Sequence, residues 1–420
     1  SLHLTADTQY LLQSCNDVGC TDSETVLVSD QLDAMIGYIK PDDVHHASVF
    51  GSDISLSDDG NTMVVSAPQA RTFTDGGGNK VGIVYVFTKT DQGLWQQQSR
   101  LKANADGDND AFGTSISLSG DGNTLVIGAR NEDSESRGVN EDDTNNLADN
   151  SGAAYVFTLT ENTWTQVAYL KADNADAGDN FGHAVAINQD GTLLVVSAPK
   201  EQSDSRVING EQNNNAGNAG AVYVFSLEDD SWSQQAYIKA ADAAADEFFG
   251  QSISLDNAGL TLAVGAIRED SSAVGVNGDA FDTGANKSGA AYVFVRDGSI
   301  WTQQAFIKAS NTDTLDNFGN AVSLSGDGNT LAVGARNEDS TATGIDADQT
   351  NNDAPDAGAV YVFVRTESDW TQQAYLKASN TDAGDNFGSA LSLSDTGDFL
   401  AVGAPSEASN GVGLAANEFD

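Results

Sequence analysis

The sequence predicts an all-β fold, a β-propeller built of four-stranded antiparallel blades. A Phe-Gly pair recurs six times, and all five tryptophans recur at intervals of 69, 68, 69 and 69 residues. The residues between these markers read as short strands punctuated by Gly and Asp-Gly turns, without sustained helical periodicity. Radial repetition of such a sheet buries each face against a neighbour, as in a propeller. The markers are Phe50, Phe112, Phe181, Phe249, Phe318 and Phe387, with Trp95, Trp164, Trp232, Trp301 and Trp370.

The first two strands of each unit follow the Phe-Gly pair. The first alternates small polar and aliphatic residues, as in 115–118, and the second is an apolar run such as 331–335. Alternation is typical of a half-buried strand, and a continuous apolar run of a strand covered on both faces. The small residues of the first strand suit the crowded centre of a ring.

The third and fourth strands carry the aromatic signature. The third reads Ala-Val-Tyr-Val-Phe or close to it, and the fourth runs from the tryptophan to Lys-Ala, as in 301–309. We expect the tryptophans to pack between blades, with sugar stacking as the alternative. The fourth-strand lysine stands just before an acidic connection, so we expect local charge compensation; the alternative is a solvent-facing edge lysine that discourages sheet pairing. These lysines are Lys40, Lys102, Lys171, Lys239, Lys308 and Lys377.

The ends of the repeat set the blade count. Six units are recognisable, although the third strand of the last blade should follow Gly411 and is not evident, and seven blades are possible in the intact protein. Residues 35–40 match the fourth-strand pattern but precede the first Phe-Gly pair. We therefore expect residues 30–420 to form one propeller, closed by pairing of strand 35–40 with the last blade.

Residues 1–29 do not fit the repeat. Segments 10–15 and 25–28 read as a hairpin around a turn flanked by Cys15 and Cys20, the only cysteines. Such a pair can close a small disulfide across a hairpin end, with two free thiols as the alternative. A disulfide favours an oxidising exterior. The segment resembles the last two strands of a fibronectin-type-III-like module, or serves as a linker.

The composition excludes polyanionic partners. The 420 residues include 62 Asp or Glu and 19 Lys or Arg, giving a net charge of −43. Such a surface repels nucleic-acid phosphates and anionic lipid headgroups. We expect no membrane insertion either, because no apolar run approaches the ~20 residues needed to span a bilayer. The start of the chain has no leader-like segment, so we expect a cytosolic protein or a mature fragment of a secreted one.

The acidic residues concentrate in two kinds of connection. In a four-stranded meander, connections 2–3 and 4–1 lie at the same end of the sheet. Connection 2–3 runs roughly 20 residues and opens with Glu-Asp-Ser in three units, and connection 4–1 repeats Asp-x-x-Asp-Asn-Phe-Gly. Loops longer than about 15 residues in a compact domain are usually functional. One face of the disc therefore carries nearly all of the long, acidic connections.

Spaced Asp, Asn and Ser oxygens with glycines between them suit Ca²⁺, which takes six to eight oxygen ligands. The alternative is a set of solvated loops whose acids form Asx-turns. The calcium candidates are Asp106, Asp108, Asp110, Asp173, Asp176, Asp179, Asp313, Asp316, Asp382, Asp385, Glu132, Asp133, Glu269, Asp270, Glu338 and Asp339.

The recurring motifs resemble the FG-GAP repeat of integrin α-subunit propellers and their bacterial relatives. They are the Phe-Gly opening, Val-Gly-Ala-Pro at 402–405 with Ser-Ala-Pro at 66–68 and 197–199, and Gly-Ala-Val-Tyr-Val-Phe, and they cover about residues 34 to 408. The resemblance implies a propeller, usually seven-bladed, an extracellular location, adhesive or ligand-binding roles, and calcium. The family's calcium loop lies between strands 1 and 2, where this chain has serine at two carboxylate positions of 117–124 and lacks the closing acid. The opposite loops are therefore the better calcium candidates.

The sequence has few residues in patterns typical of catalysis, so we expect that the protein is not an enzyme. The four histidines form no His-Glu-x-x-His motif, and there is no Gly-x-Ser-x-Gly elbow. We predict a secreted or surface-exposed bacterial propeller that binds an extracellular protein or a glycan through its acidic loop face, assisted by calcium. The alternative is a structural module of a large adhesin or a self-assembling extracellular polymer, whose partner is a copy of itself. A polysaccharide-active enzyme with a pair of carboxylates is a third reading.

Overall fold

The structure is a computed structural model. It describes the backbone of strands 9–10, 13–16, 19–22 and 26–27, and residues 39–42, 48–71, 80–104, 107 and 109–408. Every regular element in this part is a β-strand, and none of these residues belongs to a helix long and apolar enough to cross a membrane.

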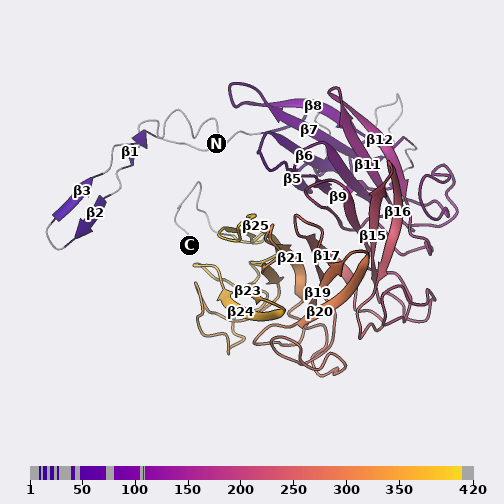
Figure 1. Ribbon diagram of the computed structural model, residues 1–420. Helices are drawn as coiled ribbons and strands as arrows, with labels where there is room; N and C mark the ends of the chain where they lie inside the picture. The colour runs from indigo at the N-terminus through magenta and orange to yellow at the C-terminus, as the bar shows by residue number, and fades with distance from the viewer. Residues whose placement is uncertain are drawn as a thin grey trace.

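The strands form six consecutive antiparallel sheets, here called blades 1 to 6, arranged around a centre (Figure 1). Blade 1 contains β5 (Ile54–Leu56), β6 (Thr62–Ala67), β7 (Ile83–Lys89) and β8 (Trp95–Leu101). Blade 2 contains β9 (Phe112–Leu118), β10 (Thr124–Ala129), β11 (Ala153–Thr160) and β12 (Thr163–Leu170). Blade 3 contains β13 (Val185–Ile187), β14 (Leu193–Ala198), β15 (Ala221–Glu228) and β16 (Ser231–Ile238).

Blade 4 contains β17 (Phe249–Leu255), β18 (Thr261–Ala266), β19 (Ala290–Asp297) and β20 (Ile300–Ile307). Blade 5 contains β21 (Phe318–Leu324), β22 (Thr330–Ala335), β23 (Ala359–Thr366) and β24 (Asp369–Leu376), and blade 6 has β25 (Ala390–Leu393) and β26 (Leu400–Gly403). In blades 1 to 5 the strands pair in sequence order. The predicted all-β propeller of four-stranded blades is confirmed.

Neighbouring blades meet through their first strands, which lie toward the middle of the molecule (Figure 1). The small polar residues of these strands link one blade to the next. The amide of Leu118 donates to Ser55 Oγ at 3.0 Å, and the amide of Ile187 donates to Ser117 Oγ at 3.1 Å. These bonds explain why serine alternates with aliphatic residues along the first strand.

The short turns between the first and second strands are joined in a chain at one end of the ring. Each turn donates a backbone hydrogen bond to the turn of the next blade, from Asp58 to Gly120, on to Gln189 and Asn257, and then to Gly326 and Asp395, at 2.9 to 3.0 Å. The turns on this face are therefore short, as the sequence predicts, and each is joined to the next.

Aromatic side chains fill the space between the blades. Phe112 meets Tyr155 edge-on with ring centroids 5.4 Å apart, and equivalent pairs recur in the other complete blades. Trp164 is buried and its Nε1 donates to Gln98 of blade 1 at 3.2 Å, so the tryptophan packs between blades as predicted. The glycine after the phenylalanine has no room for a side chain: a Cβ on Gly182, whose φ is +85°, would lie 2.1 Å from the carbonyl oxygen of Ala153.

Residues 39–42 lie beside blade 1. The amide of Asp42 donates to Gln97 Oε1 at 3.1 Å, just as the amide of Asn104 donates to Gln166 Oε1 of the next blade at 3.0 Å. Ile39 packs against the core of blade 1. These residues thus occupy the place where the fourth strand of a preceding blade ends. Residues 35–38 and 409–420 lie outside the described residues, so closure of the ring by strand 35–40 stays a prediction.

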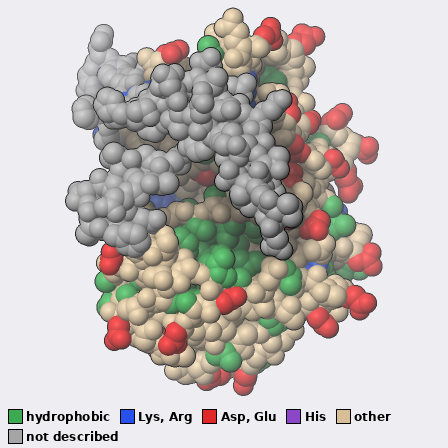
Figure 2. All heavy atoms as spheres, turned by 90° about the vertical axis from the view of Figure 1, so that its left-hand side faces the viewer, with side chains coloured by type: hydrophobic (Ala, Val, Ile, Leu, Met, Phe, Trp, Pro, Cys, Tyr) green, Lys and Arg blue, Asp and Glu red, His purple; other side chains and the backbone are tan. Residues whose placement is uncertain are grey.

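The first blade presents an apolar face at the start of the ring. Ile54 and Leu56 are 53% and 50% exposed, whereas their counterparts Ile116 and Leu118 in blade 2 are 5% and 7% exposed against blade 1. Figure 2 shows the side that lies at the left of Figure 1: apolar side chains gather in one hollow, and acidic side chains are scattered over the remaining surface.

The amino-terminal strands form separate two-stranded pairs. β2 (Gln13–Asn16) and β3 (Gly19–Asp22) make a hairpin that places Cys15 directly opposite Cys20, and β1 (Gln9–Tyr10) pairs with β4 (Val26–Leu27). A hairpin therefore surrounds the two cysteines, but its second strand is β3 and not segment 25–28, part of which pairs with β1. The disulfide and the resemblance to a fibronectin-type-III-like module stay predictions.

Candidate functional site

The long connections of each blade lie at one end of its sheet, which we call the loop face. In blade 2 the connection between the second and third strands is residues 130–152, and residues 171–180 lead to blade 3. Backbone hydrogen bonds join the two connections: the amide of Lys171 donates to the carbonyl oxygen of Gly138 at 2.9 Å, and the amide of Asn180 donates to that of Asn150 at 3.0 Å. The predicted placement of both connections on one face is therefore correct.

Buried ion pairs between lysine and glutamate anchor the loop face. The lysine ends the fourth strand, the glutamate opens the 2–3 connection of the same blade, and each side chain is at most 3% exposed. For these lysines charge compensation is confirmed, and the alternative of a solvent-facing edge lysine is wrong. The pairs are Lys171–Glu132 at 2.7 Å, Lys239–Glu201 at 2.9 Å, Lys308–Glu269 at 2.6 Å and Lys377–Glu338 at 2.7 Å.

Further donors complete each ion pair. In blade 2, Glu132 Oε1 accepts from the Tyr169 hydroxyl at 2.9 Å and from the amide of Ser134 at 3.0 Å. Lys171 Nζ also donates to Ser151 Oγ at 2.6 Å. Burial lowers the pKa of Lys171, and the charge of Glu132 opposes that shift. The glutamates thus hold the long connection onto the fourth strand, so the calcium role predicted for Glu132, Glu269 and Glu338 is corrected: their carboxylates bind lysine.

The acids that precede the Phe-Gly pair close tight turns. Asp179 Oδ2 accepts from the amide of Asp176 at 2.9 Å, and Asp316 and Asp385 accept in the same way from the amides of Asp313 and Asp382. Burial raises the pKa of Asp179 and Asp316 to about 8. These carboxylates therefore accept from the backbone amide three residues earlier, which differs from an Asx-turn, where the side chain accepts from the amide two residues later.

The other calcium candidates lie as follows. Asp110 Oδ2 accepts from the amide of Gly107 at 3.1 Å, and Asp173 is exposed. Asp133, Asp270 and Asp339 each accept from a backbone amide of their own 2–3 connection, at 2.6, 2.7 and 2.8 Å. Asp106 and Asp108 lie outside the described residues.

The turn at the family's calcium position closes on itself. Ser119 Oγ donates to Asp121 Oδ1 at 2.6 Å, and the amide and side-chain nitrogens of Asn123 donate to the two Asp121 oxygens at 2.9 Å each. The same bonds recur around Asp59 and Asp327. Because protein donors already satisfy both carboxylate oxygens, these turns do not fit calcium. Among the described residues, no three His, Cys, Asp or Glu side chains form a group able to hold a metal ion.

Blade 4 departs from the repeated network. In blade 3, Asn174 accepts from the Tyr223 hydroxyl at 2.8 Å and donates to Glu201 at 3.2 Å. Asp242 stands at that position in blade 4. Its Oδ2 accepts from the Tyr292 hydroxyl at 2.8 Å, but its buried Oδ1 has no hydrogen-bond partner among the described residues.

Two carboxyl groups therefore lie close together in blade 4. Burial raises the pKa of Asp242, and burial together with the charge of Asp242 raises the pKa of Glu269. Phe306 also replaces the tyrosine that donates to the glutamate in blades 2, 3 and 5. Sequence reasoning did not single out this position, although aligning the repeats displays both changes.

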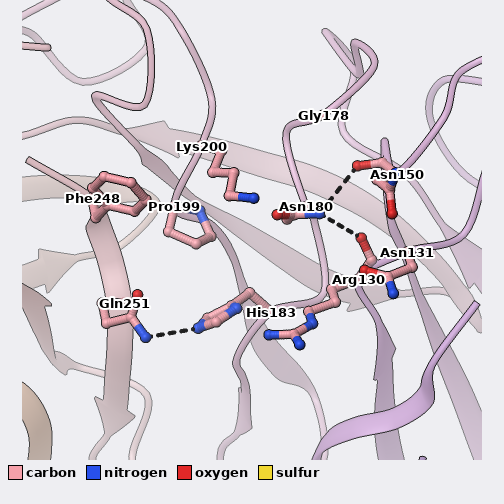
Figure 3. Close-up of a pocket in the computed structure, with 10 residues that line it drawn as sticks. All are labelled: Arg130, Asn131, Asn150, Gly178, Asn180, His183, Pro199, Lys200, Phe248 and Gln251. Carbon is pink, nitrogen blue, oxygen red and sulfur yellow. Dashed lines mark hydrogen bonds between the residues drawn. The ribbon is translucent and has the colours of Figure 1, made fainter. Parts of the chain in front are cut away.

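A polar cavity of about 340 Å³ lies on the loop face where blades 2, 3 and 4 meet (Figure 3). Arg130 and Asn131 follow β10, Pro199 and Lys200 follow β14, and His183, Phe248 and Gln251 come from the starts of blades 3 and 4; Asn150, Gly178 and Asn180 complete the wall. Within the described part of the chain, neither Arg130 nor Lys200 has a carboxylate within 4.0 Å.

The basic side chains of this cavity belong to a repeated pattern. A basic residue stands one or two positions after the second strand in four consecutive blades, as Arg130, Lys200, Arg268 and Arg336. Sequence reasoning missed this pattern, because it treated the loop face as acidic throughout. The signal was nevertheless present in the residues that follow each Gly-Ala or Ser-Ala pair.

Amide groups and a neutral histidine shape the rest of the cavity. The side chains of His183 and Gln251 point toward one another in Figure 3, with Nε2 atoms 3.1 Å apart. Burial and the charge of Arg130 lower the pKa of His183 to about 4, so the imidazole is neutral at pH 7. Asn180 Nδ2 donates to the carbonyl oxygens of Arg130 and Asn150 at 3.0 and 3.4 Å, which fixes the wall.

Comparison with known proteins agrees with the repeat. A model described as "FG-GAP repeat" matches residues 95–157, 164–225, 232–294, 301–363 and 370–415, and no curated protein matches the chain. Among solved structures, a "putative 6-phosphogluconolactonase" from Bacteroides uniformis is similar at 11% identity, covering 78% of this chain and 85% of that chain with a TM-score of 0.43. That likeness is too weak to inform function. The repeat model covers more than half of the chain, and its first four matches end within the third strand of a blade, so the chain belongs to the FG-GAP repeat family.

Proposed function

We propose that this protein is a non-enzymatic extracellular module for binding or adhesion, and that its loop face engages a protein or glycan partner. FG-GAP repeats are typical of extracellular proteins. The long connections are held rigidly by the buried lysine–glutamate pairs, which gives the loop face a fixed shape. A preorganised surface loses less conformational entropy when it binds.

Exposed apolar side chains on this face carry the proposal. Each of four successive 2–3 connections presents at least one large apolar residue to solvent. The most exposed in each are Leu147, Val207, Phe281 and Ile345, at 62% to 71% exposed. A single exposed apolar residue needs no explanation, but four successive connections give the loop face a set of apolar side chains that a partner can contact. Arg130 and Lys200, which have no ion pair in the described residues, lie on the same face, where they are free to meet an acidic group.

The contacts of His183 in the cavity support a non-enzymatic role. His183 is the only histidine among the described residues, and its ring nitrogen contacts the Gln251 amide, which is neither a nucleophile nor a carboxylate. Calcium assistance stays a prediction. The proposal does not depend on it, since protein donors engage the carboxylates of the repeated turns.

The test compares the two faces of the full chain. A variant with Leu147, Val207, Phe281 and Ile345 replaced by serine is expected to lose most binding to cell surfaces and to a glycan array. Its control replaces Leu260 and Ile300 by serine. Both are exposed and lie at the opposite face: Leu260 is in the short turn before β18, and Ile300 begins β20 after the short turn from β19. Circular dichroism checks that both variants fold.

Three outcomes would contradict the proposal. Loss of binding in the control variant alone would assign the partner to the opposite face. Concentration-dependent self-assembly without binding to cells or glycans would favour the structural-module alternative. Turnover of a polysaccharide, abolished by replacing one acid that does not recur in the repeat, would show an enzyme.

A further inference from the structure

We propose that the cavity between blades 2, 3 and 4 binds an acid sugar, with Arg130 and Lys200 meeting its carboxylate and the amide side chains meeting its hydroxyl groups. This inference rests on the proposed function and names the ligand class. It assigns a ligand site to a basic cavity on a strongly acidic molecule.

The first argument is the distribution of charge. Acidic residues outnumber basic residues by 62 to 19, and yet two cations face one cavity without a carboxylate partner in the described residues. Neither cation has a described ion pair, whereas every fourth-strand lysine of blades 2 to 5 has its own glutamate. An anion between Arg130 and Lys200 would form charge-assisted hydrogen bonds, which are stronger than neutral ones.

The second argument is the neutral lining. Asn131, Asn150 and Gln251 present amide groups, each of which both donates and accepts hydrogen bonds, and neutral His183, whose Nε2 contacts the Gln251 amide, adds a ring donor. A bare carboxylate only accepts and would leave these acceptors unpaired. Sugar hydroxyl groups both donate and accept, so they match the wall. The apolar faces of Phe248 and Pro199 offer contact to the carbon skeleton.

The third argument is size and surroundings. A cavity of about 340 Å³ is at the small end of ligand pockets, which suits one sugar ring. A polyanion would have to lie along a surface with a net charge of −43 and would be repelled. A single acidic unit at the end of a glycan avoids that repulsion. An acidic side chain of a protein would fill less of the cavity and would leave the amides unpaired.

Isothermal titration calorimetry on the full chain tests the ligand class. The probes are D-glucuronate, D-galacturonate and N-acetylneuraminate, with D-glucose, acetate and inorganic phosphate as separate arms. At least one acid sugar is expected to bind about tenfold or more tightly than glucose, acetate and phosphate, because both the charge and the hydroxyl groups contribute. Its affinity should fall as sodium chloride is raised.

Matched variants locate the site. Arg130→Gln with Lys200→Gln is expected to weaken acid-sugar binding by about 30-fold or more. The control is Arg137→Gln on the same face: Arg137 forms a surface ion pair with Asp176 at 3.0 Å and does not line the cavity. Thermal melting should show both variants folded, because Arg130, Lys200 and Arg137 are all exposed.

Distinct results would overturn the inference. They are the absence of binding by all three acid sugars, equal binding of acetate or phosphate alone, or unchanged binding by the double variant. If cells and glycans bind the loop face while the double variant behaves as wild type, only this inference fails. If free acid sugar binds the cavity but no cell or array glycan binds the chain, only the proposed function fails.

Discussion

At the scale of single residues, the buried ion pairs dominate the loop face. Lys239→Met is expected to destabilise the protein by about 3–5 kcal/mol, because it leaves the buried carboxylate of Glu201 without its cation. Lys200→Met in the same blade is the control. Lys200 is exposed and has no ion pair in the described residues, so we expect a change within about 0.5 kcal/mol. Urea unfolding measures both, and equal effects would contradict the assigned role of Lys239.

Asp242→Asn is expected to stabilise the protein by about 1–3 kcal/mol. The asparagine would give Glu269 the donor that Asn311 gives Glu338 at 2.9 Å in the next blade, and it would remove one of two adjacent carboxyl groups. The reverse change, Asn311→Asp, should destabilise by a similar amount. Melting temperature reports both changes, and a fall with Asp242→Asn would show that its unpartnered oxygen serves another purpose.

The sequence predicted that the fourth-strand lysines compensate charge, but it could not identify their partners. Glu132 lies 39 residues before Lys171, and only the folded sheet brings them together. The same glutamate looked like a calcium ligand, since a carboxylate oxygen suits a hard cation and an ammonium group equally. Burial decided between them, and burial is a property of the fold.

At the scale of elements, the serine–aspartate turns are held by their own hydrogen bonds. Ser325→Ala is expected to cost about 1 kcal/mol, because it removes the donor to Asp327 and the acceptor for the amide of Thr330. Urea unfolding measures the loss, and a variant as stable as wild type would contradict it.

Calcium provides an independent check on these turns. If calcium assists the protein as predicted, the melting temperature of the full chain is higher with calcium chloride than with a chelator, because a cation bound only by the native state raises it. An unchanged melting temperature would contradict calcium assistance. A higher melting temperature with calcium would direct attention to the acidic connections, including Asp106 and Asp108. Magnesium chloride at the same ionic strength is the control.

Strand positions were the most predictable part of the molecule. The Phe-Gly pair, the tyrosine and the tryptophan each mark a strand, and the glycine is required where its Cβ would meet a carbonyl oxygen, as at Gly182. The length of the connections and the face on which they lie were predictable from the sequence, but their hydrogen bonds and ion pairs were not. Their bonds join residues of different strands, which no local pattern shows.

At the scale of the whole molecule, acidic groups greatly outnumber basic ones. The exception is the cavity between blades 2, 3 and 4, which two basic side chains line. The net charge of −43 does not reveal the basic residues that follow the second strands. Two of them, Arg130 and Lys200, line one cavity only because consecutive blades place their first strands around one centre. The cavity was therefore the part of the candidate site that could not be predicted from the sequence.

The stability of the fold should fall as pH rises from about 5 to about 8. Burial raises the pKa of Asp179, Glu247 and Asp316 to about 8, so between their ordinary pKa and that value the folded chain holds more protons than the unfolded chain. Each group then lowers the free energy of unfolding by at most about 1.4 kcal/mol per pH unit.

His183 acts in the opposite direction at lower pH. Its pKa is lowered to about 4, so its contribution to stability is lost as pH falls from about 6.5 toward 4. Because the three raised acids outweigh the one histidine, we expect maximal stability near pH 4, measured by urea unfolding across the range. Asp316→Asn should flatten the decline above pH 6. Stability that rises steadily to pH 8 would contradict the assignment.

The order of strands within the blades bears on synthesis of the chain. Blades 1 to 5 each pair four strands that are consecutive in sequence, and Lys171 completes its ion pair with a residue only 39 positions earlier. Most contacts of a blade are thus available as soon as its fourth strand leaves the ribosome. Short loops between contacting residues favour rapid folding, and domains generally fold from the amino terminus during translation. Each finished blade then offers the next one a formed surface, so the ring can grow during translation without waiting for the end of the chain.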